Sequence, residues 1–266
     1  MNNAEFSELL QQKGAELYRN MPWREDTRPY YVLVSELMLQ QTQVDRVIPK
    51  FNAFIERFPD EAGLAKSSLA DVLTMWSGLG YNRRAKFLHE TAKRITYDFH
   101  GNFPVTKELL LTLPGVGEGT AGAILNYAFN KPTVFIETNV RTVYFHHFFT
   151  KGDLVTDGQI AEKVAQTIDT EHPREFYWAI MDYGTWLKKN GASRIAQSAH
   201  YKKQAPLKGS VREVRGQIIR LLTGGDLSLD AVALQLKADE RFSRALDGLM
   251  RDGLVTETDQ RLHLTK

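Results

Sequence analysis

The sequence predicts an all-α protein over residues 1–203, followed by a small C-terminal domain, and three observations lead to this prediction. Apolar residues recur at helical spacing through most of the first 200 positions. Proline and glycine interrupt these apolar stretches, and strand patterns are sparse there. The 266 residues are 42% hydrophobic and 25% charged, which is ordinary for a globular protein large enough to bury a core.

Two of the predicted helices show their buried faces most clearly. The stretch over residues 44–58 stops at Pro59, and its apolar residues at helical spacing are Val47, Phe51, Phe54, Ile55 and Phe58. The stretch over residues 68–76 has an apolar face made of Leu69, Val72, Leu73 and Trp76. Further helices are predicted over residues 31–43, 82–99, 107–112 and 121–129.

The pattern changes after a polar linker over residues 204–211, so residues 212–266 are predicted to form a separate domain. Helices are predicted over residues 213–222, 228–236 and 241–252. The alternating LVTETDQRLHL that follows predicts a β-hairpin turning at Asp259-Gln260. Three short helices and a hairpin are the layout of a winged helix, with Arg241, Ser243 and Arg244 near the start of its third helix.

Composition excludes several kinds of chemistry. The chain has no cysteine, so it has no disulfide, no thiolate nucleophile, no cysteine-ligated zinc and no cysteine-held iron–sulfur cluster. The N-terminus is polar and acidic, and no apolar run is long enough to span a bilayer. We therefore expect a cytoplasmic protein without a membrane partner, associated with the nucleoid if the source is bacterial.

Charge is concentrated in one segment although the formal net charge is only +2. Residues 188–220 hold nine basic side chains and one acidic side chain, Glu213. Such a segment is typical of a polyanion-binding surface. A solvated linker is the alternative, and charge alone leaves both open.

Residues 113–120, LPGVGEGT, lie between two of the predicted helices and form a candidate phosphate-binding turn. Gly115 and Gly117 allow positive φ and lack Cβ atoms, so backbone N–H groups can point outward together at a helix N-terminus. One phosphate of a nucleic-acid backbone fits there without base readout. The alternative is a tight turn whose glycines serve packing only. The candidate contacts are Gly115, Val116, Gly117, Gly119 and Thr120.

The string LPGVGEGTAGAIL resembles the helix–hairpin–helix of the HhH-GPD superfamily of DNA glycosylases. Three further strings resemble the MutY-type adenine DNA glycosylases: PWR (22–24) followed by SELMLQQTQV (35–44), WSGLGYNRRAKFLH (76–89) and FIETNVRTV (135–143). The similarity runs over residues 20–190 in the family's order. It implies two helical subdomains around a DNA cleft, with residues 28–131 inserted between the N-terminal segment and 132–203.

The resemblance also implies a pair of catalytic carboxylates. Glu36 lies among apolar residues, where a carboxylate is either exposed on one helix face or buried with a raised pKa. In MutY-type enzymes the Glu at this position protonates the adenine, so Glu36 is assigned as general acid. Glu137 stands where the family usually has Asp and would stabilise the positively charged sugar. Asn139 matches the family's Asn and would orient the reacting groups.

Other positions match family segments that contact DNA. Gln40, Gln41, Leu79 and Tyr81 match loops that fill the gap left by a flipped base. Ordinary core packing is the alternative for Leu79 and Tyr81. The basic loop adds Lys188, Lys189 and Arg194 as DNA-contact candidates. Bifunctional relatives have a nucleophilic lysine where this chain has Gly119, so we expect a monofunctional enzyme.

Two departures separate the chain from most MutY-type proteins. The four cysteine positions of their iron–sulfur loop align with Lys188, Ile195, Ser198 and Gln204, so no cluster and no other metal cofactor is expected. The Nudix-like C-terminal domain is replaced by the predicted winged helix, which would grip duplex DNA, contact a repair partner or pack on the catalytic core.

The expected activity is base excision repair of double-stranded DNA that contains a mismatched or damaged base. The enzyme would flip out an adenine that lies opposite G or 8-oxoG and hydrolyse its N-glycosidic bond. Two alternatives remain: a thymine or uracil mismatch glycosylase of the same fold, and a catalytically impaired DNA-binding protein. One catalytic unit per chain makes a monomer the default.

Overall fold

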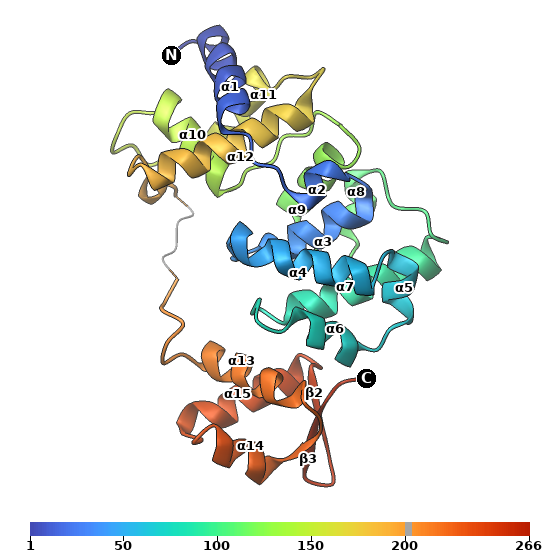
Figure 1. Ribbon diagram of the computed structural model, residues 1–266. Coiled ribbons are helices and arrows are strands. Elements are labelled where there is room, and N and C mark those ends of the chain that lie inside the picture. Colours follow the sequence, from blue (N-terminus) through green and yellow to red (C-terminus); the bar gives the residue numbers. More distant parts are fainter. Residues whose placement is uncertain (200–203) are drawn as a thin grey trace. The chain divides into compact units, whose positions relative to one another are not determined.

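The computed structural model (Figure 1) describes residues 1–199 and 204–266. It divides into two compact units. The first unit contains residues 1–32, 105–112 and the described part of 116–203. The second contains residues 33–104, 113–115 and 204–266. Helices make up nearly all of the regular structure described, which confirms the predicted fold class, and the C-terminal residues add a three-stranded sheet.

The first unit is built around a long helix, α12. Its elements are α1 (Asn3–Leu17), α2 (Pro22–Glu25), the start of α3 (Pro29–Leu39), α8 (Lys107–Leu111), α9 (Glu118–Tyr127), α10 (Thr138–Phe148), α11 (Asp157–Thr167), α12 (Pro173–Lys189) and a short 3₁₀ turn, Ile195–Gln197. Helix α1 packs against α12 (Figure 1). Gly14 permits this approach, because a Cβ there would lie 2.8 Å from the Cβ of Ala179.

The second unit has an aromatic core. Its helices outside the C-terminal domain are the end of α3, α4 (Val44–Arg57), α5 (Glu61–Lys66), α6 (Leu69–Trp76) and α7 (Arg83–Lys93), which continues as a π-turn over Arg94–Asp98. Phe54 packs edge-to-face against Phe58 and Trp76, with ring centroids 5.0 and 6.2 Å away. The predicted apolar faces of residues 44–58 and 68–76 are buried except for Ile55, which is half-buried.

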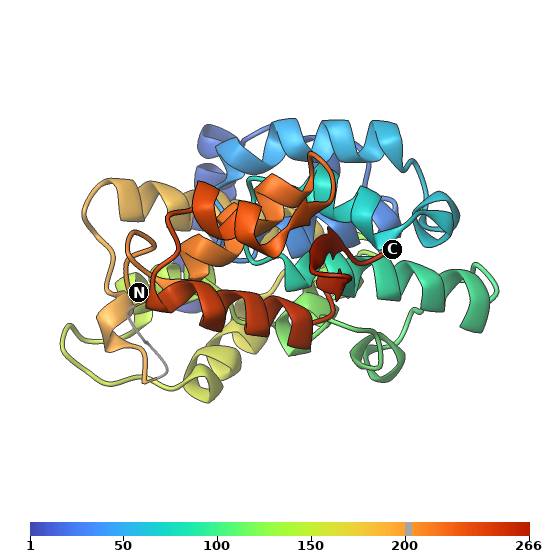
Figure 2. The same cartoon turned by 90° about the horizontal axis from the view of Figure 1, so that it is seen from below.

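The C-terminal residues fold as the sequence predicts, and they are drawn orange to red in Figures 1 and 2. The elements are α13 (Val211–Leu222), β1 (Leu227–Ser228), α14 (Leu229–Gln235), α15 (Glu240–Arg251), β2 (Val255–Thr258) and β3 (Arg261–Leu264). Ser228 caps α14, and Asp259 and Gln260 turn the hairpin with φ of 49° and 60°. The short strand β1, which the sequence did not predict, pairs with β3 and completes the order β1-β3-β2.

Two predicted helix limits are wrong. The helix predicted over 31–43 ends at Leu39, because Gln41 adopts a left-handed backbone with φ of 58°. The helix predicted over 121–129 begins earlier, at Glu118, with Gly117 as its N-cap. Among residues 1–199 and 204–266, no helix combines the length and the apolar character needed to cross a membrane.

Candidate functional site

The glycine-rich turn between α8 and α9 is held against α7 by close packing. Gly115 has φ of +76°, and a Cβ there would lie 2.8 Å from the Cβ of Phe87. The Thr91 hydroxyl donates a 2.8 Å hydrogen bond to the carbonyl of Pro114. Glycine is therefore required at 115 for two independent reasons, conformation and space.

Gly117 differs from the expectation of positive φ. Its backbone is extended, with φ of −96° and ψ of −176°, because it is the residue before the first turn of α9. A Cβ at Gly117 or at Gly119 would meet nothing within 4 Å among the described residues. The N-terminus of α9 thus faces open space, as an anion site requires. Val116 is buried, whereas Gly117 is exposed.

The end of helix α3 is capped by an arginine from α7. The guanidinium of Arg84 is buried, and its Nη1 donates at 2.6, 2.9 and 2.6 Å to the backbone carbonyls of Leu37, Met38 and Gln40. Its Nη2 donates to the Gly80 carbonyl at 3.0 Å and to Thr42 Oγ1 at 3.2 Å. Burial lowers the pKa of Arg84 to about 10.

This capping arginine joins the two loops that are candidates for DNA contact. Gln40 and Gln41 follow α3, and the second loop spans residues 77–82. Glu36, one turn before the capped end of α3, is half-buried. Because Arg84 bonds to both loops, their backbones are fixed relative to each other. Arg84 lies in the family-like string over residues 76–89, but no pattern in that string predicts its capping role.

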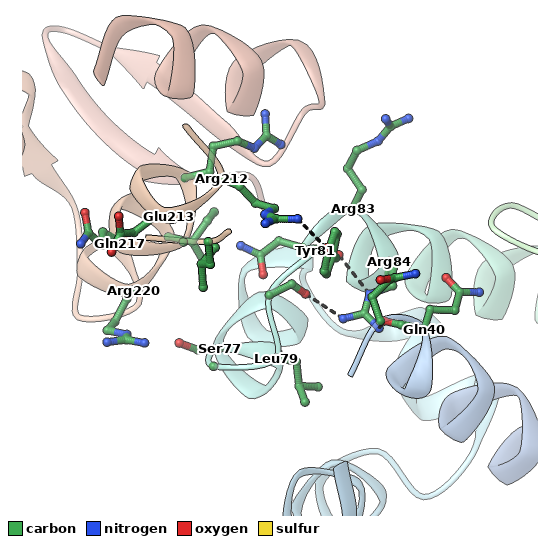
Figure 3. Close-up of a pocket in the computed structure, with 18 of the residues that line it drawn as sticks. Gln40, Ser77, Leu79, Tyr81, Arg83, Arg84, Arg212, Glu213, Gln217 and Arg220 are labelled. Atoms are coloured by element: carbon green, nitrogen blue, oxygen red, sulfur yellow. Dashed lines mark hydrogen bonds between the residues drawn. The ribbon is translucent and has the colours of Figure 1, made fainter. Parts of the chain in front are cut away.

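Tyr81 lies between two arginines (Figure 3). The guanidinium carbons of Arg84 and Arg212 are 5.4 and 5.5 Å from its ring centroid. Its hydroxyl accepts a 2.7 Å hydrogen bond from Arg212 Nη1 and a second from the side chain of Gln204. Leu79, the other candidate in this loop, is only 4% exposed and packs in the core of the second unit.

Glu137 and Asn139 lie at the start of α10 in the first unit, whereas Glu36 belongs to the second unit. The stacked rings of Phe135 and Tyr177, with centroids 4.0 Å apart, fix the segment before this helix. Gly184 allows α12 to approach, because a Cβ there would lie 2.8 Å from the Cβ of Asn139.

The two polar side chains at this helix start are electrostatically unusual. Burial raises the pKa of Glu137, and the positive charges of Arg141 and Lys188 oppose this rise. The Nδ2 of Asn139 contacts Met181 Sδ at 3.5 Å. The buried Oδ1 of Asn139 has no hydrogen-bond partner among the described residues. An orphaned buried acceptor beside a perturbed carboxyl is typical of a site that binds a polar ligand.

The candidates in the basic loop have different surroundings. Lys188 and Lys189 are both exposed. The charge of Lys188 nevertheless acts on Glu137, and partial desolvation lowers the pKa of Lys188 itself. Arg194 Nη1 donates to the carbonyls of Phe145 and Phe149, at 3.1 and 3.3 Å, and so caps the end of α10. The basic residues Lys202 and Lys203 lie outside the described residues.

The segment aligned with the family's iron–sulfur loop does not fit such a cluster, because it offers no thiolate. In addition to the Arg194 cap, Gln197 Nε2 donates to the carbonyls of Thr150 and Asp153 at 2.8 and 3.1 Å. In the described part of the chain, no group of three His, Asp or Glu residues could hold a metal ion.

The arginine of the PWR string, Arg24, forms a buried ion pair. The guanidinium of Arg24 donates to both carboxylate oxygens of Asp182 in α12, at 2.7 and 3.1 Å, and Arg19 donates to the same carboxylate at 2.6 Å. Arg24 also lies over the rings of Tyr18 and Trp178, at 5.3 Å from each centroid. These ion pairs therefore bind the segment before α3 to helix α12, the central helix of the first unit.

Comparison with known proteins agrees with these features. Residues 34–169 match the family described as HhH-GPD superfamily base excision DNA repair protein. The chain is 32% identical over 264 residues to the adenine DNA glycosylase of Mycobacterium tuberculosis, covering 91% of this chain and 87% of that protein. It is 36% identical over 183 residues to the adenine DNA glycosylase of Buchnera aphidicola subsp. Baizongia pistaciae, covering 66% of this chain.

The match to the Buchnera protein covers 51% of it, so the chain spans about half the length of that relative. Among solved structures, a thermostable thymine-DNA glycosylase has the same fold, with a TM-score of 0.64 and 23% sequence identity. That match covers 68% of this chain and 85% of the other chain. The family match over residues 34–169, together with the tuberculosis relative, settles the classification. The chain belongs to the HhH-GPD superfamily of base excision DNA repair proteins.

Proposed function

We propose that this chain is a monofunctional adenine DNA glycosylase, which removes adenine mispaired with guanine or 8-oxoguanine from double-stranded DNA. The observation that carries the proposal is 32% identity, along 91% of the chain, to a protein named adenine DNA glycosylase. Gly119 in place of a nucleophilic lysine supports hydrolysis without strand cleavage. The absence of cysteine supports a reaction without an iron–sulfur cluster.

In this mechanism the two carboxyl groups act on opposite ends of the bond that breaks. Glu36 donates a proton to a ring nitrogen of adenine, so that the base leaves as a neutral molecule. The sugar carbon becomes positively charged as the C1′–N9 bond breaks, and the ionised Glu137 stabilises that charge. Water then adds to C1′ and loses a proton, which leaves an abasic site.

The orphaned acceptor of Asn139 supports an orienting role beside Glu137. The Oδ1 atom is buried and available to a hydrogen-bond donor, such as the attacking water or a hydroxyl group. The raised pKa of Glu137, with burial as its largest cause, also supports a carboxyl that is only partly hydrated at this half-buried position.

The main contacts to the DNA backbone would come from the turn around Gly115 and the exposed N-terminus of α9. Gly117, Gly119 and Thr120 at that helix start, with Val116 buried behind them, are the proposed phosphate contacts. Gln40, Gln41 and Tyr81 are proposed to contact the base pair opened by flipping, and Lys188 and Lys189 the backbone. For Leu79 and Arg194 we propose supporting roles, because the first is buried and the second caps α10.

Four duplexes test the substrate: A·8-oxoG, A·G, T·G and U·G, each incubated with the protein and then treated with alkali. Breaks in the first two duplexes alone are expected. Breaks in the last two alone would replace adenine with a pyrimidine as the substrate. Binding without breaks in any duplex would indicate a DNA-binding protein without this activity.

Variants test the two carboxyl groups. Glu36→Gln is expected to slow single-turnover excision by about 10²–10⁴-fold through loss of the acid. Glu137→Ala is expected to slow it by about 10²–10³-fold through loss of charge stabilisation. The exposed Glu56 of α4 and Glu175 of α12 provide the controls Glu56→Gln and Glu175→Gln, which should match the parent. A Glu137→Ala protein that cleaves as fast as the parent would contradict its assignment.

A further inference from the structure

A cavity of about 980 Å³ lies within the second unit, between the C-terminal domain and the helices before it. Its walls come from the loop 77–82, helix α7, helix α13 and the end of α15. Figure 3 shows Arg212 and Arg220 of α13 on one side, with Arg83 and Arg84 on the other. Glu137 is not among the residues that line this cavity.

The lining of this cavity is strongly basic. It contains two carboxylates, Glu213 and Asp252, and six arginines: Arg46, Arg83, Arg84, Arg212, Arg215 and Arg220. The formal charge is therefore +4. Guanidinium groups are the side chains best suited to binding phosphate oxygens in pairs. The volume is within the range of sites that hold a nucleotide-sized ligand.

The cavity also adjoins the candidate phosphate-binding turn. Phe87 lines the cavity, and the same side chain packs against Gly115 of the turn. Arg83 stands one helical turn before Phe87, with its guanidinium carbon 5.3 Å from the ring centroid. Helix α7 therefore carries both the side chain that packs against Gly115 and an arginine of the cavity lining.

The third helix of the C-terminal domain is a poorer candidate for DNA contact. Arg241 at its start donates to Asp239 at 2.8 and 3.1 Å and lies 3.8 Å from Glu213. Its positive charge is thus balanced by neighbouring carboxylates. Helix α13 places three arginines in the cavity lining: Arg215 pairs with Asp252, whereas Arg212 and Arg220 have no carboxylate partner among the described residues.

We propose that this arginine-lined cavity binds a phosphodiester segment of DNA, so that the C-terminal domain contacts DNA through α13 rather than through its third helix. The inference takes its ligand from the proposed function, because DNA is the polyanion such an enzyme meets. Within the cavity, Arg46 and Arg220 are exposed and would contact phosphate directly. Arg212 would act in addition as a positioning residue, since it holds the Tyr81 ring.

The test measures the affinity of the full chain for an undamaged 20-base-pair duplex at several salt concentrations. Each lost phosphate contact reduces the slope of log K against log salt by about 0.9. Arg220→Gln is expected to reduce it by about one, and Arg46→Gln with Arg220→Gln by about two. With equal binding of parent and double variant at 1 M salt, where the counterion contribution vanishes, the double variant is expected to bind about 60-fold more weakly at 0.1 M.

Arg244→Gln is the matched control, because Arg244 is an exposed arginine on α15 outside the cavity lining. It should keep the parental slope and affinity. The reverse result, a loss with Arg244→Gln and none with the cavity variants, would overturn the proposal in favour of the third helix. Unchanged binding in all variants would also overturn it, and tight binding of an acidic peptide instead of DNA would mark a protein partner site.

These outcomes are independent of the proposed excision activity. The duplex carries no mismatch, and binding is measured without turnover. A chain that binds it through the cavity but excises no adenine would contradict the proposed function and leave the cavity assignment standing. If the chain excises adenine but the cavity variants bind the duplex as tightly as the parent, the proposed function stands and the cavity assignment is contradicted. Melting temperatures of the variants confirm that each remains folded.

Discussion

Replacing Arg84 with lysine tests whether the capping arginine holds the two candidate DNA-contact loops together. Both Nη atoms of Arg84 are occupied, by four backbone carbonyls and by the Thr42 hydroxyl. Lysine keeps the positive charge but offers only three N–H groups, all from one atom. At least two of the acceptors around Arg84 must therefore lose their donor.

The size of the effect follows from this count. A buried acceptor left without a donor costs about 1–3 kcal/mol, so Arg84→Lys should lower the free energy of unfolding by about 2–6 kcal/mol. In a domain of this size each kcal/mol corresponds to a fall in melting temperature of about 2–4 °C. The burial that lowers the pKa of Arg84 to about 10 adds to the cost, because an ammonium group is more strongly hydrated than a guanidinium.

Urea denaturation and a thermal melt measure this loss, with Arg83→Lys as the control for stability. Arg83 lies next to Arg84 on α7, but its side chain is 60% exposed and 3.6 Å from Asp252. Its replacement should change the free energy of unfolding by less than about 0.5 kcal/mol. If Arg84→Lys costs no more than Arg83→Lys, the hydrogen bonds do not hold the loops.

Further predictions concern the buried ion pair, the glycine turn and the half-buried carboxyl of Glu137. Asp182→Asn leaves buried arginine charge uncompensated and should cost about 3–5 kcal/mol, measured by urea denaturation. Gly115→Ala should lower both the melting temperature and the DNA affinity, whereas Gly119→Ala, where a Cβ meets nothing within 4 Å, should keep the melting temperature at or above that of the parent. Because burial raises the pKa of Glu137 above 4.5, single-turnover excision should fall, as pH is lowered, at a higher pH than an ordinary glutamate would give. Lys188→Met removes a positive charge that lowers the pKa of Glu137, so it should move the acidic limb of the pH–rate profile to still higher pH. If Lys188 only binds DNA, the substitution would instead weaken DNA affinity and leave the acidic limb in place.

Local signals in the sequence predicted much of the fold. Ser228 before an apolar run predicted the start of α14, and Asp259-Gln260 predicted the hairpin turn. Both depend on neighbours within a few residues. Strand β1 has only two residues, so it carries no alternation that could predict it.

Side-chain contacts between residues far apart in the sequence could not be predicted from such local signals. Arg24 and Asp182 are 158 positions apart, and Arg84 reaches helix α3 across 47. No periodicity links such residues, although their family strings pointed to the segments that contain them. The position of Gly117 was predicted correctly as part of the turn, but its φ was not, because a glycine at a helix N-cap adopts an extended backbone that other residues also tolerate.

Helix α7 sets a fixed interval between two neighbouring features. Thr91 holds the glycine turn through the Pro114 carbonyl, and Arg83 lies at the rim of the cavity. At about 1.5 Å of rise per residue these two positions are separated by about 12 Å along the helix axis. This distance matches the axial length of about three to four base pairs. Inserting one helical turn into α7 would therefore move the two proposed DNA contacts about 5.4 Å further apart along the helix axis.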